Sequence, residues 1–266
     1  MPISLAKINH KTFLINLLFS FIPISFIAGN LILNINILLF IIFAIFFYGK
    51  GVFSLKLDRL DKIILIFFAY TIFIGFLNNF YLQATLMDGD YTIAIKTILY
   101  LRFLIFYFVI KFLINKNLIN FKLFFIFCFI CTYFVSLDLM YQLNSGKDVF
   151  GYVSADPRRY AGPFGTEFIA GSYLQRFALF ALFLFPIFFN NKDKIYLYLL
   201  SLLTFILIMA GLIVAGNRVP LILFIMLITC VLFFYKPMKK FLFSFFLISI
   251  IVLSTLWNFN PNIKNH

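Results

Sequence analysis

Runs of about 20 apolar residues recur along the whole chain, and this feature restricts its fold more than any other. Each run is long enough to cross roughly 30 Å of hydrocarbon as an α-helix, whereas a membrane β-barrel would show shorter segments of alternating polarity. Only 12% of the 266 residues are charged, against about 25% in soluble domains. The sequence therefore predicts an all-α fold, a polytopic transmembrane helical bundle in which residues 1–266 form a single integral membrane domain.

The apolar runs predict nine transmembrane helices. We place them at residues 12–28, 31–48, 63–80, 92–110, 122–143, 167–189, 195–214, 219–235 and 241–257. Pro23 and Pro186 fall inside two of these spans and are expected to kink them. The N-terminal "MPISLAKINHK" leads into the first span without a small-residue cleavage site, so we expect this helix to be retained.

The distribution of basic residues predicts the orientation of the spans. Of the 22 Lys and Arg residues, 14 fall on one side of the nine-span topology. They are Lys7, Lys11, Lys50, Lys56, Arg59, Lys62, Lys111, Lys116, Lys122, Lys192, Lys194, Lys236, Lys239 and Lys240. That side is expected to be cytoplasmic, which places the N-terminus inside and the C-terminus outside. The net charge of +13 is then mainly a topology signal, and no nucleic-acid partner is expected.

Eight basic residues are left unexplained by this orientation rule. They are Lys96, Arg102, Lys147, Arg158, Arg159, Arg176, Arg218 and Lys264. Arg102 lies about ten residues into its span, roughly 15 Å deep, and Arg176 is roughly 9 Å deep. A charge at such depth costs several kcal/mol unless it is paired or wetted, so it indicates a functional site. The structural alternative is that Arg102 pairs with Asp138 between helices and that the outer residues contact membrane lipid phosphates.

The functional interpretation is an anion site that opens to the outside. Arginine offers a planar fork of donors that matches phosphate oxygens, and Arg158, Arg159, Arg218, Arg102, Arg176 and Lys96 are its candidate residues. The stretch "RRYAGPFGTEFIAG" (158–171) adds glycines that let backbone amides approach an anion. Within it, Thr166 is expected to cap the sixth helix and Glu167 to occupy the first helical turn, where an acid is favoured by the helix dipole.

Two segments resemble the O-antigen ligase and O-antigen polymerase superfamily. "RRYAGPFGTEFIAGSYL" is similar to the family's Arg-x-x-Gly-x-Phe-Gly segment with a further Gly some six residues later. The matching positions are Arg159, Gly162, Phe164, Gly165 and Gly171. "VAGNRVPLIL" (214–223) resembles the family's second outer turn, with Arg218 in the Arg position and Asn217 in place of the usual Ser. The resemblance covers residues 155–235.

This resemblance implies a membrane glycosyltransferase of the bacterial inner membrane. Such an enzyme moves a glycan from undecaprenyl pyrophosphate to an acceptor at the periplasmic face. The acceptor would be a lipid A core sugar in a ligase or a second lipid-linked glycan in a polymerase. The family needs no metal or cofactor, and its arginines, here Arg159 and Arg218, hold the pyrophosphate while a general base activates the acceptor hydroxyl.

The sequence departs from the family after its last expected span. The family continues into a large outer loop that carries, in ligases, a His often followed by Asn, whereas here "WNFNPNIKNH" ends the chain. The two histidines, His10 and His266, are unsuited as bases by their positions. We therefore expect the chain to be truncated or split before that loop. The catalytic base is then absent or is one of Glu167, Asp138 and Asp156. Asp156 has an alternative role, because together with Arg158 it flanks Pro157 and could order the loop.

Other motifs carry little chemistry. Cys128 and Cys131 lie inside an apolar span, which favours packing over redox or metal chemistry. Asp88 and Asp90 are typical of a solvated turn, and no P-loop, dinucleotide fingerprint or nucleophilic Ser elbow is present. A transporter or flippase of a lipid-linked oligosaccharide, or a non-catalytic membrane subunit, stays as an alternative. A transporter is disfavoured by the lack of an inverted repeat. A structural subunit would not explain Arg102 or the arginines and glycines of residues 158–171.

Overall fold

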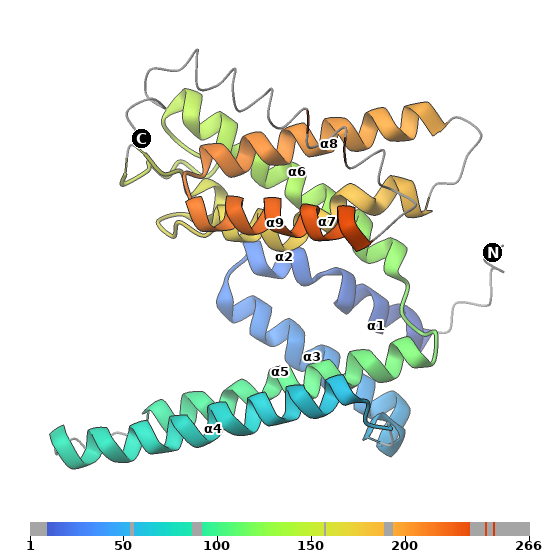
Figure 1. Ribbon diagram of the computed structural model, residues 1–266, viewed down its shortest axis with the longest axis vertical. Coiled ribbons are helices and arrows are strands. Elements are labelled where there is room, and N and C mark those ends of the chain that lie inside the picture. The colour runs from blue at the N-terminus through green and yellow to red at the C-terminus, as the bar shows by residue number, and fades with distance from the viewer. Residues whose placement is uncertain are drawn as a thin grey trace. The chain divides into compact units, whose positions relative to one another are not determined.

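The computed structural model describes residues 10–53, 56–86, 92–156, 158–188 and 194–234, together with residues 243 and 247 (Figure 1). Within these ranges the regular elements are helices, and no strand is found beyond two isolated bridges. The first half comprises α1 (His10–Ser20), α2 (Ile22–Ile27), α3 (Asn30–Tyr48), the 3₁₀ turn η1 (Gly49–Phe53), α4 (Arg59–Leu86) and α5 (Thr92–Asn115). The second half comprises α6 (Phe121–Ser145), the 3₁₀ turn η2 (Gly162–Phe164), α7 (Ala170–Phe188), α8 (Lys194–Val214) and α9 (Arg218–Phe234). The prediction of an all-α fold is confirmed for the described residues.

Six of these helical segments are long and apolar enough to cross a membrane. They are His10–Ile27, Asn30–Tyr48, Arg59–Tyr81, Ile93–Asn115, Phe121–Ser145 and Ala170–Phe188. Two shorter apolar helices, Leu199–Val214 and Arg218–Val231, coincide with the seventh and eighth expected spans. The ninth expected span, 241–257, lies outside the described residues, as do Asp88, Asp90 and His266. The nine-span count and the orientation of the termini stay predictions.

Two helix boundaries show how local sequence interrupts the apolar pattern. The first expected span is divided at Phe21, two residues before Pro23, because proline lacks an amide donor and crowds the preceding turn. The sixth begins at Ala170 instead of residue 167, so the predicted cap at Thr166 and first-turn position of Glu167 are wrong. Gly165 has φ 66° and ψ −110°. After it, the Glu167 amide donates to the Phe164 carbonyl and the Ile169 amide donates to the Glu167 carbonyl, which forms two turns. Helical hydrogen bonding begins where the Tyr173 amide donates to the Ile169 carbonyl.

Contacts divide the chain into two compact units. Unit 1 comprises Met1–Ser25 and Asn30–Asn120, and unit 2 comprises Phe26–Gly29 and Phe121–His266. The single membrane domain expected from the sequence stays a prediction.

In unit 1, α4 and α5 form a long antiparallel hairpin (Figure 1). The helices approach closely at Gly75, where a β-carbon would overlap the Thr97 side chain. Near the same end of the hairpin, the buried Asn79 Oδ1 accepts a hydrogen bond from the Ala94 amide at 3.3 Å. Small residues at helix crossings and interhelical hydrogen bonds are the means by which membrane helices associate.

The opposite end of this hairpin carries an ion-pair cluster. Lys111 on α5 pairs with Asp58 at 2.8 Å and with the buried Asp61 on α4. Tyr107 donates a hydrogen bond to Asp61 Oδ1 at 2.7 Å, and the Asp58 amide donates one to Asp61 Oδ2 at 2.6 Å. Asp61 is therefore a buried carboxylate whose two oxygens are both satisfied.

In unit 2, α7 packs against α6, α8 and α9 (Figure 1). These helices approach closely at Gly211 on α8, where a β-carbon would lie 2.8 Å from Ser136 Oγ on α6 and 2.9 Å from Leu174 Cδ1 on α7. Tyr173 on α7 is fully buried and contacts the rings of Phe26 at 5.6 Å and Phe177 at 4.8 Å. This core positions the segments that connect the helices at one end of the unit.

Candidate functional site

The candidate site is built on the loop between α6 and α7, residues 146–169. Figure 1 shows this loop at the same end of unit 2 as the end of α8 and the start of α9. Its first part is a tight turn in which the Asp148 amide bonds the Tyr152 carbonyl at 3.0 Å and the Gly151 amide bonds the Asp148 carbonyl at 3.0 Å. The Tyr152 amide in turn donates to Asp148 Oδ1 at 2.6 Å. The turn therefore has a defined backbone path.

Two buried side chains of α6 fasten this loop to the helices. Asp138 Oδ1 accepts a hydrogen bond from the Val149 amide at 2.8 Å. Gln142 uses both ends of its amide, donating to the Tyr152 carbonyl at 3.3 Å and accepting from the Gly162 amide at 2.9 Å. One side chain thus joins two parts of the loop that are ten residues apart. Because buried backbone groups must be paired, Gln142 determines the loop path at both points.

The adjacent arginines lie in a second turn. The Arg158 amide donates to Asp156 Oδ1 at 2.9 Å, and the Arg159 amide donates to the Asp156 carbonyl at 3.2 Å. Ser154 Oγ donates to the Asp156 carbonyl at 2.8 Å and is also hydrogen-bonded to the Arg159 carbonyl. Asp156 therefore orders the backbone that carries the arginines, which agrees with the loop-ordering alternative for this residue.

The two segments that carry the resemblance are in direct contact. Gly216, in the turn between α8 and α9, has φ +69°, and a β-carbon there would overlap the carbonyl oxygen of Arg158. The Asn217 side chain donates to the Phe168 carbonyl at 2.8 Å. A β-carbon on Gly171 would lie 3.2 Å from Cβ of the same asparagine. The structure thus brings the Arg-Gly loop and the Arg218 turn together.

The remaining matched positions hold the loop against the helices. Phe164 packs its ring on Tyr173 of α7, with centroids 5.4 Å apart. Gly162 lies over Leu139 of α6, where a β-carbon would be 3.2 Å from Leu139 Cγ. These two residues position the backbone and present no free polar side chain.

The arginines of unit 2 present their charges at the surface. Arg158, Arg159, Arg176 and Arg218 are all exposed. Within the described part of the chain, the Arg158 and Arg159 guanidinium groups form no ion pair, whereas Arg176 lies over the Phe26 ring at 5.3 Å. A pair of exposed guanidinium groups on an ordered backbone offers the forked donors that a phosphate requires.

Lys96 and Arg102 belong to α5 of unit 1. Lys96 is exposed, and Arg102 is partly buried with its guanidinium over the Phe103 ring at 4.8 Å. Its Nε atom is buried and has no hydrogen-bond partner among the described residues. The participation of these residues in an anion site, and the pairing of Arg102 with Asp138, stay predictions.

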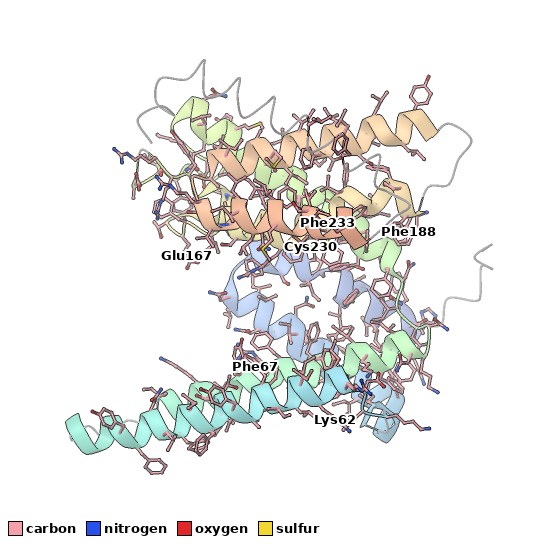
Figure 2. All side chains as sticks on the ribbon, in the orientation of Figure 1. Lys62, Phe67, Glu167, Phe188, Cys230 and Phe233 are labelled. Atoms are coloured by element: carbon pink, nitrogen blue, oxygen red, sulfur yellow. The ribbon has the colours of Figure 1, made fainter. Side chains whose placement is uncertain are left out.

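The candidate acids differ in accessibility. Glu167 is exposed, and Figure 2 shows it at the loop end of unit 2, whereas Phe188 lies at the opposite end. Asp138 is only 2% exposed. Its Oδ2 atom and that of the equally buried Asp148 have no hydrogen-bond partner among the described residues. Of the candidate acids predicted from the sequence, Glu167 is therefore the most accessible, whereas Asp156 is only partly exposed and Asp138 is buried.

The sequence does not identify three residues that shape this region: Gln142, Asp148 and Gly216. Gln142 is an amide near the end of an apolar span, a signal that could have marked it. Gly216 precedes Asn217, which replaces the family's Ser, and Arg218, which matches its Arg. Asp148 had no signal, because only the path of the loop buries it.

The described residues contain no group of three or more His, Cys, Asp or Glu side chains able to hold a metal ion. Cys128 and Cys131 are free thiols buried in α6, as expected from a packing role. Comparison with protein-family models, curated proteins and solved structures found no match to this chain.

Proposed function

We propose that this protein is a glycosyltransferase of the O-antigen ligase or polymerase type in a bacterial inner membrane. It would bind an undecaprenyl-pyrophosphate-linked glycan at the periplasmic face. The observation that carries the proposal is the packing of Gly216 against Arg158, which unites the two segments that resemble this superfamily. Arg158, Arg159 and Arg218, which lie on these two segments, are exposed, and we propose that they bind one anionic group.

The proposed reaction forms one bond and breaks another. The acceptor hydroxyl oxygen bonds to the anomeric carbon of the donor sugar, the anomeric carbon–oxygen bond to phosphate breaks, and undecaprenyl pyrophosphate leaves with the bonding electrons. Arg158, Arg159 and Arg218 stabilise the charge on the departing pyrophosphate. The hydroxyl proton passes to a carboxylate base, a step that typically contributes 10²- to 10⁴-fold.

Glu167 is the carboxylate proposed for that step. It lies in the same loop as the arginines and is exposed. Asp156 instead uses an oxygen to hold the Arg158 amide, and Asp138 is buried beneath the loop. The acceptor, a lipid A core sugar or a second lipid-linked glycan, would approach from the same side.

A binding experiment tests the anion site. Arg159→Ala and Arg218→Ala are expected to weaken retention of undecaprenyl pyrophosphate by purified protein in nanodiscs by roughly 10- to 100-fold, the value of a lost charge-assisted contact. Arg→Lys variants are expected to recover little, because lysine lacks the bidentate fork. Lys147→Ala, an exposed cation of the same loop outside the matched motif, is the control. Equal binding by all the arginine variants and the control would overturn the anion site.

A transfer assay tests the catalytic role. Glu167→Gln is expected to lower glycan transfer from a lipid-linked donor to the acceptor by about 10²- to 10⁴-fold while donor binding is unchanged. Thr166→Ala, at the neighbouring exposed position, is the matched control. Full activity of Glu167→Gln would assign the base elsewhere, and donor binding without transfer by the unaltered protein would favour a transporter or a non-catalytic subunit.

A further inference from the structure

Tyr152 is an aromatic side chain held in a fixed place at the protein surface. Its backbone makes three hydrogen bonds, to Asp148 Oδ1 at 2.6 Å, to the Asp148 amide at 3.0 Å and to Gln142 Nε2 at 3.3 Å. Asp148 and Gln142 are both buried. Yet 53% of the Tyr152 residue stays exposed. A rigid backbone combined with an exposed ring is the arrangement of a preorganised contact surface.

The ring of Tyr152 lies beside the motif loop. A β-carbon on Gly165 would be 3.9 Å from the Tyr152 ring atoms Cε2 and Cζ, which is ordinary van der Waals contact. Because residue 165 has no side chain, nothing from this position covers the ring. Gly165 is followed closely by Glu167 and preceded by the arginines of the same loop. The ring therefore lies beside the loop segment that joins the arginines to Glu167.

We propose that Tyr152 forms the sugar subsite of this site, stacking against the sugar residue that is linked directly to the pyrophosphate. This inference rests on the function proposed above. A sugar presents C–H groups on one face and hydroxyls at its edge, and tyrosine offers an apolar ring with a polar tip that complements both. The sugar attached to a bound pyrophosphate must lie within one bond of the phosphate oxygens, beside the arginine loop. The Tyr152 ring lies beside Gly165 of that loop.

The other exposed apolar residues of the turn do not share this geometry. Val149, Phe150 and Val153 are also more than half exposed. The three atoms nearest to a β-carbon on Gly165 all belong to the Tyr152 ring, and none belongs to these residues. Phe150 therefore serves as a matched control, a similarly exposed aromatic residue of the same turn. A purely lipid-facing role for the turn would make the two aromatic residues equivalent.

The experiment compares two probes on the full chain in nanodiscs. One is undecaprenyl pyrophosphate carrying a single N-acetylglucosamine, and the other is undecaprenyl pyrophosphate without a sugar. Tyr152→Ala is expected to weaken binding of the sugar-bearing lipid by about 5- to 10-fold, the scale of an aromatic contact, and to leave the sugar-free lipid unchanged. Tyr152→Phe is expected to retain most of the affinity. Phe150→Ala is expected to change neither probe.

The outcomes separate this inference from the proposed function. Equal loss of both probes with Tyr152→Ala, or no loss of either, would overturn the sugar subsite while leaving the anion site intact. Failure of the unaltered protein to bind either probe would overturn the proposed function and the subsite with it. If Tyr152→Ala does not fold, Tyr152→Leu keeps an apolar contact at Gly165 without an aromatic ring and is expected to show the same selective loss.

Discussion

The backbone of Gly216 packs directly on the carbonyl group of Arg158, leaving no space for a β-carbon. These residues lie 58 positions apart, in the turn after α8 and in the loop before α7. Gly216 also adopts φ +69°, a backbone conformation that side chains with a β-carbon rarely take. The positions of Arg158 and Arg159 relative to Arg218 therefore depend on a residue without a side chain at position 216.

Gly216→Ala is expected to lower the unfolding midpoint of the purified protein and to weaken binding of undecaprenyl pyrophosphate. The substitution combines the strain of a positive φ with a clash against backbone, together about 2–5 kcal/mol. The measurement is thermal unfolding in detergent, followed by lipid binding below the midpoint. Gly146→Ala is the control, since Gly146 has φ +76° and nothing within 4 Å of an added β-carbon, so only the strain of about 1–2 kcal/mol is expected. Identical effects of the two substitutions would mean that the Gly216 contact contributes nothing.

Gln142→Leu is expected to destabilise the loop of unit 2. It leaves the buried Gly162 amide without its partner, which costs about 1–3 kcal/mol. It also removes one of two hydrogen bonds to the Tyr152 carbonyl, which keeps the one from the Asp148 amide. Hydrogen exchange measured by mass spectrometry should show faster exchange of peptides covering 146–169. The exposed Asn144, on the same helix, supplies the control Asn144→Leu, for which exchange should be unchanged. Unaltered exchange in Gln142→Leu would show that the loop holds its path without this side chain.

Lys111→Met is expected to destabilise the α4–α5 hairpin more than Asp61→Asn or the double substitution does. Removal of the lysine alone leaves the buried Asp61 carboxylate without its ion pair, whereas Asn at 61 is neutral. Thermal unfolding of the four proteins in detergent forms a double-mutant cycle. Lys116→Met, at an exposed position beyond the helix, should leave the midpoint unchanged. Additive effects of the two substitutions would argue against coupling between these residues.

Cysteine labelling tests the expected orientation of the chain. In a background lacking Cys128, Cys131 and Cys230, cysteine at position 147 or 167 is expected to react with a membrane-impermeant maleimide in intact spheroplasts. Cysteine at position 116 is expected to react only after permeabilisation, because basic residues favour the cytoplasmic side. All three positions are exposed, so access alone does not distinguish them. Labelling of position 167 only after permeabilisation would remove the periplasmic site.

The helices could be predicted from the sequence because apolar length is a property of each segment by itself. The eight spans expected before residue 236 each coincide with a helix or, around Phe21, with a divided one. The start of α7 could not be predicted in this way. A Thr-Glu pair is a common helix start, but the unusual backbone at Gly165 and the turns after it delay the helix to Ala170.

The site was predictable in part for a similar reason. The arginines and glycines of 158–171 stand out in an apolar chain, so their segment could be identified. The hydrogen bonds that hold them depend on how the loop crosses α6, and no spacing in the sequence encodes that path. Asp138 illustrates the limit, because its charge is visible in the sequence, whereas its burial and its hydrogen bond with the Val149 amide depend on the fold.

The anchoring of the loop through Gln142 and Asp138 separates its shape from its exposed side chains. Both residues bond to backbone groups, at Tyr152, Gly162 and Val149. These hydrogen bonds therefore do not depend on which side chains the loop carries at those positions. Side chains at the turn, such as Val149 and Phe150, can therefore be exchanged while the backbone keeps its course. For protein engineering, this turn is a place where surface side chains can be varied by library selection without rebuilding the scaffold beneath it.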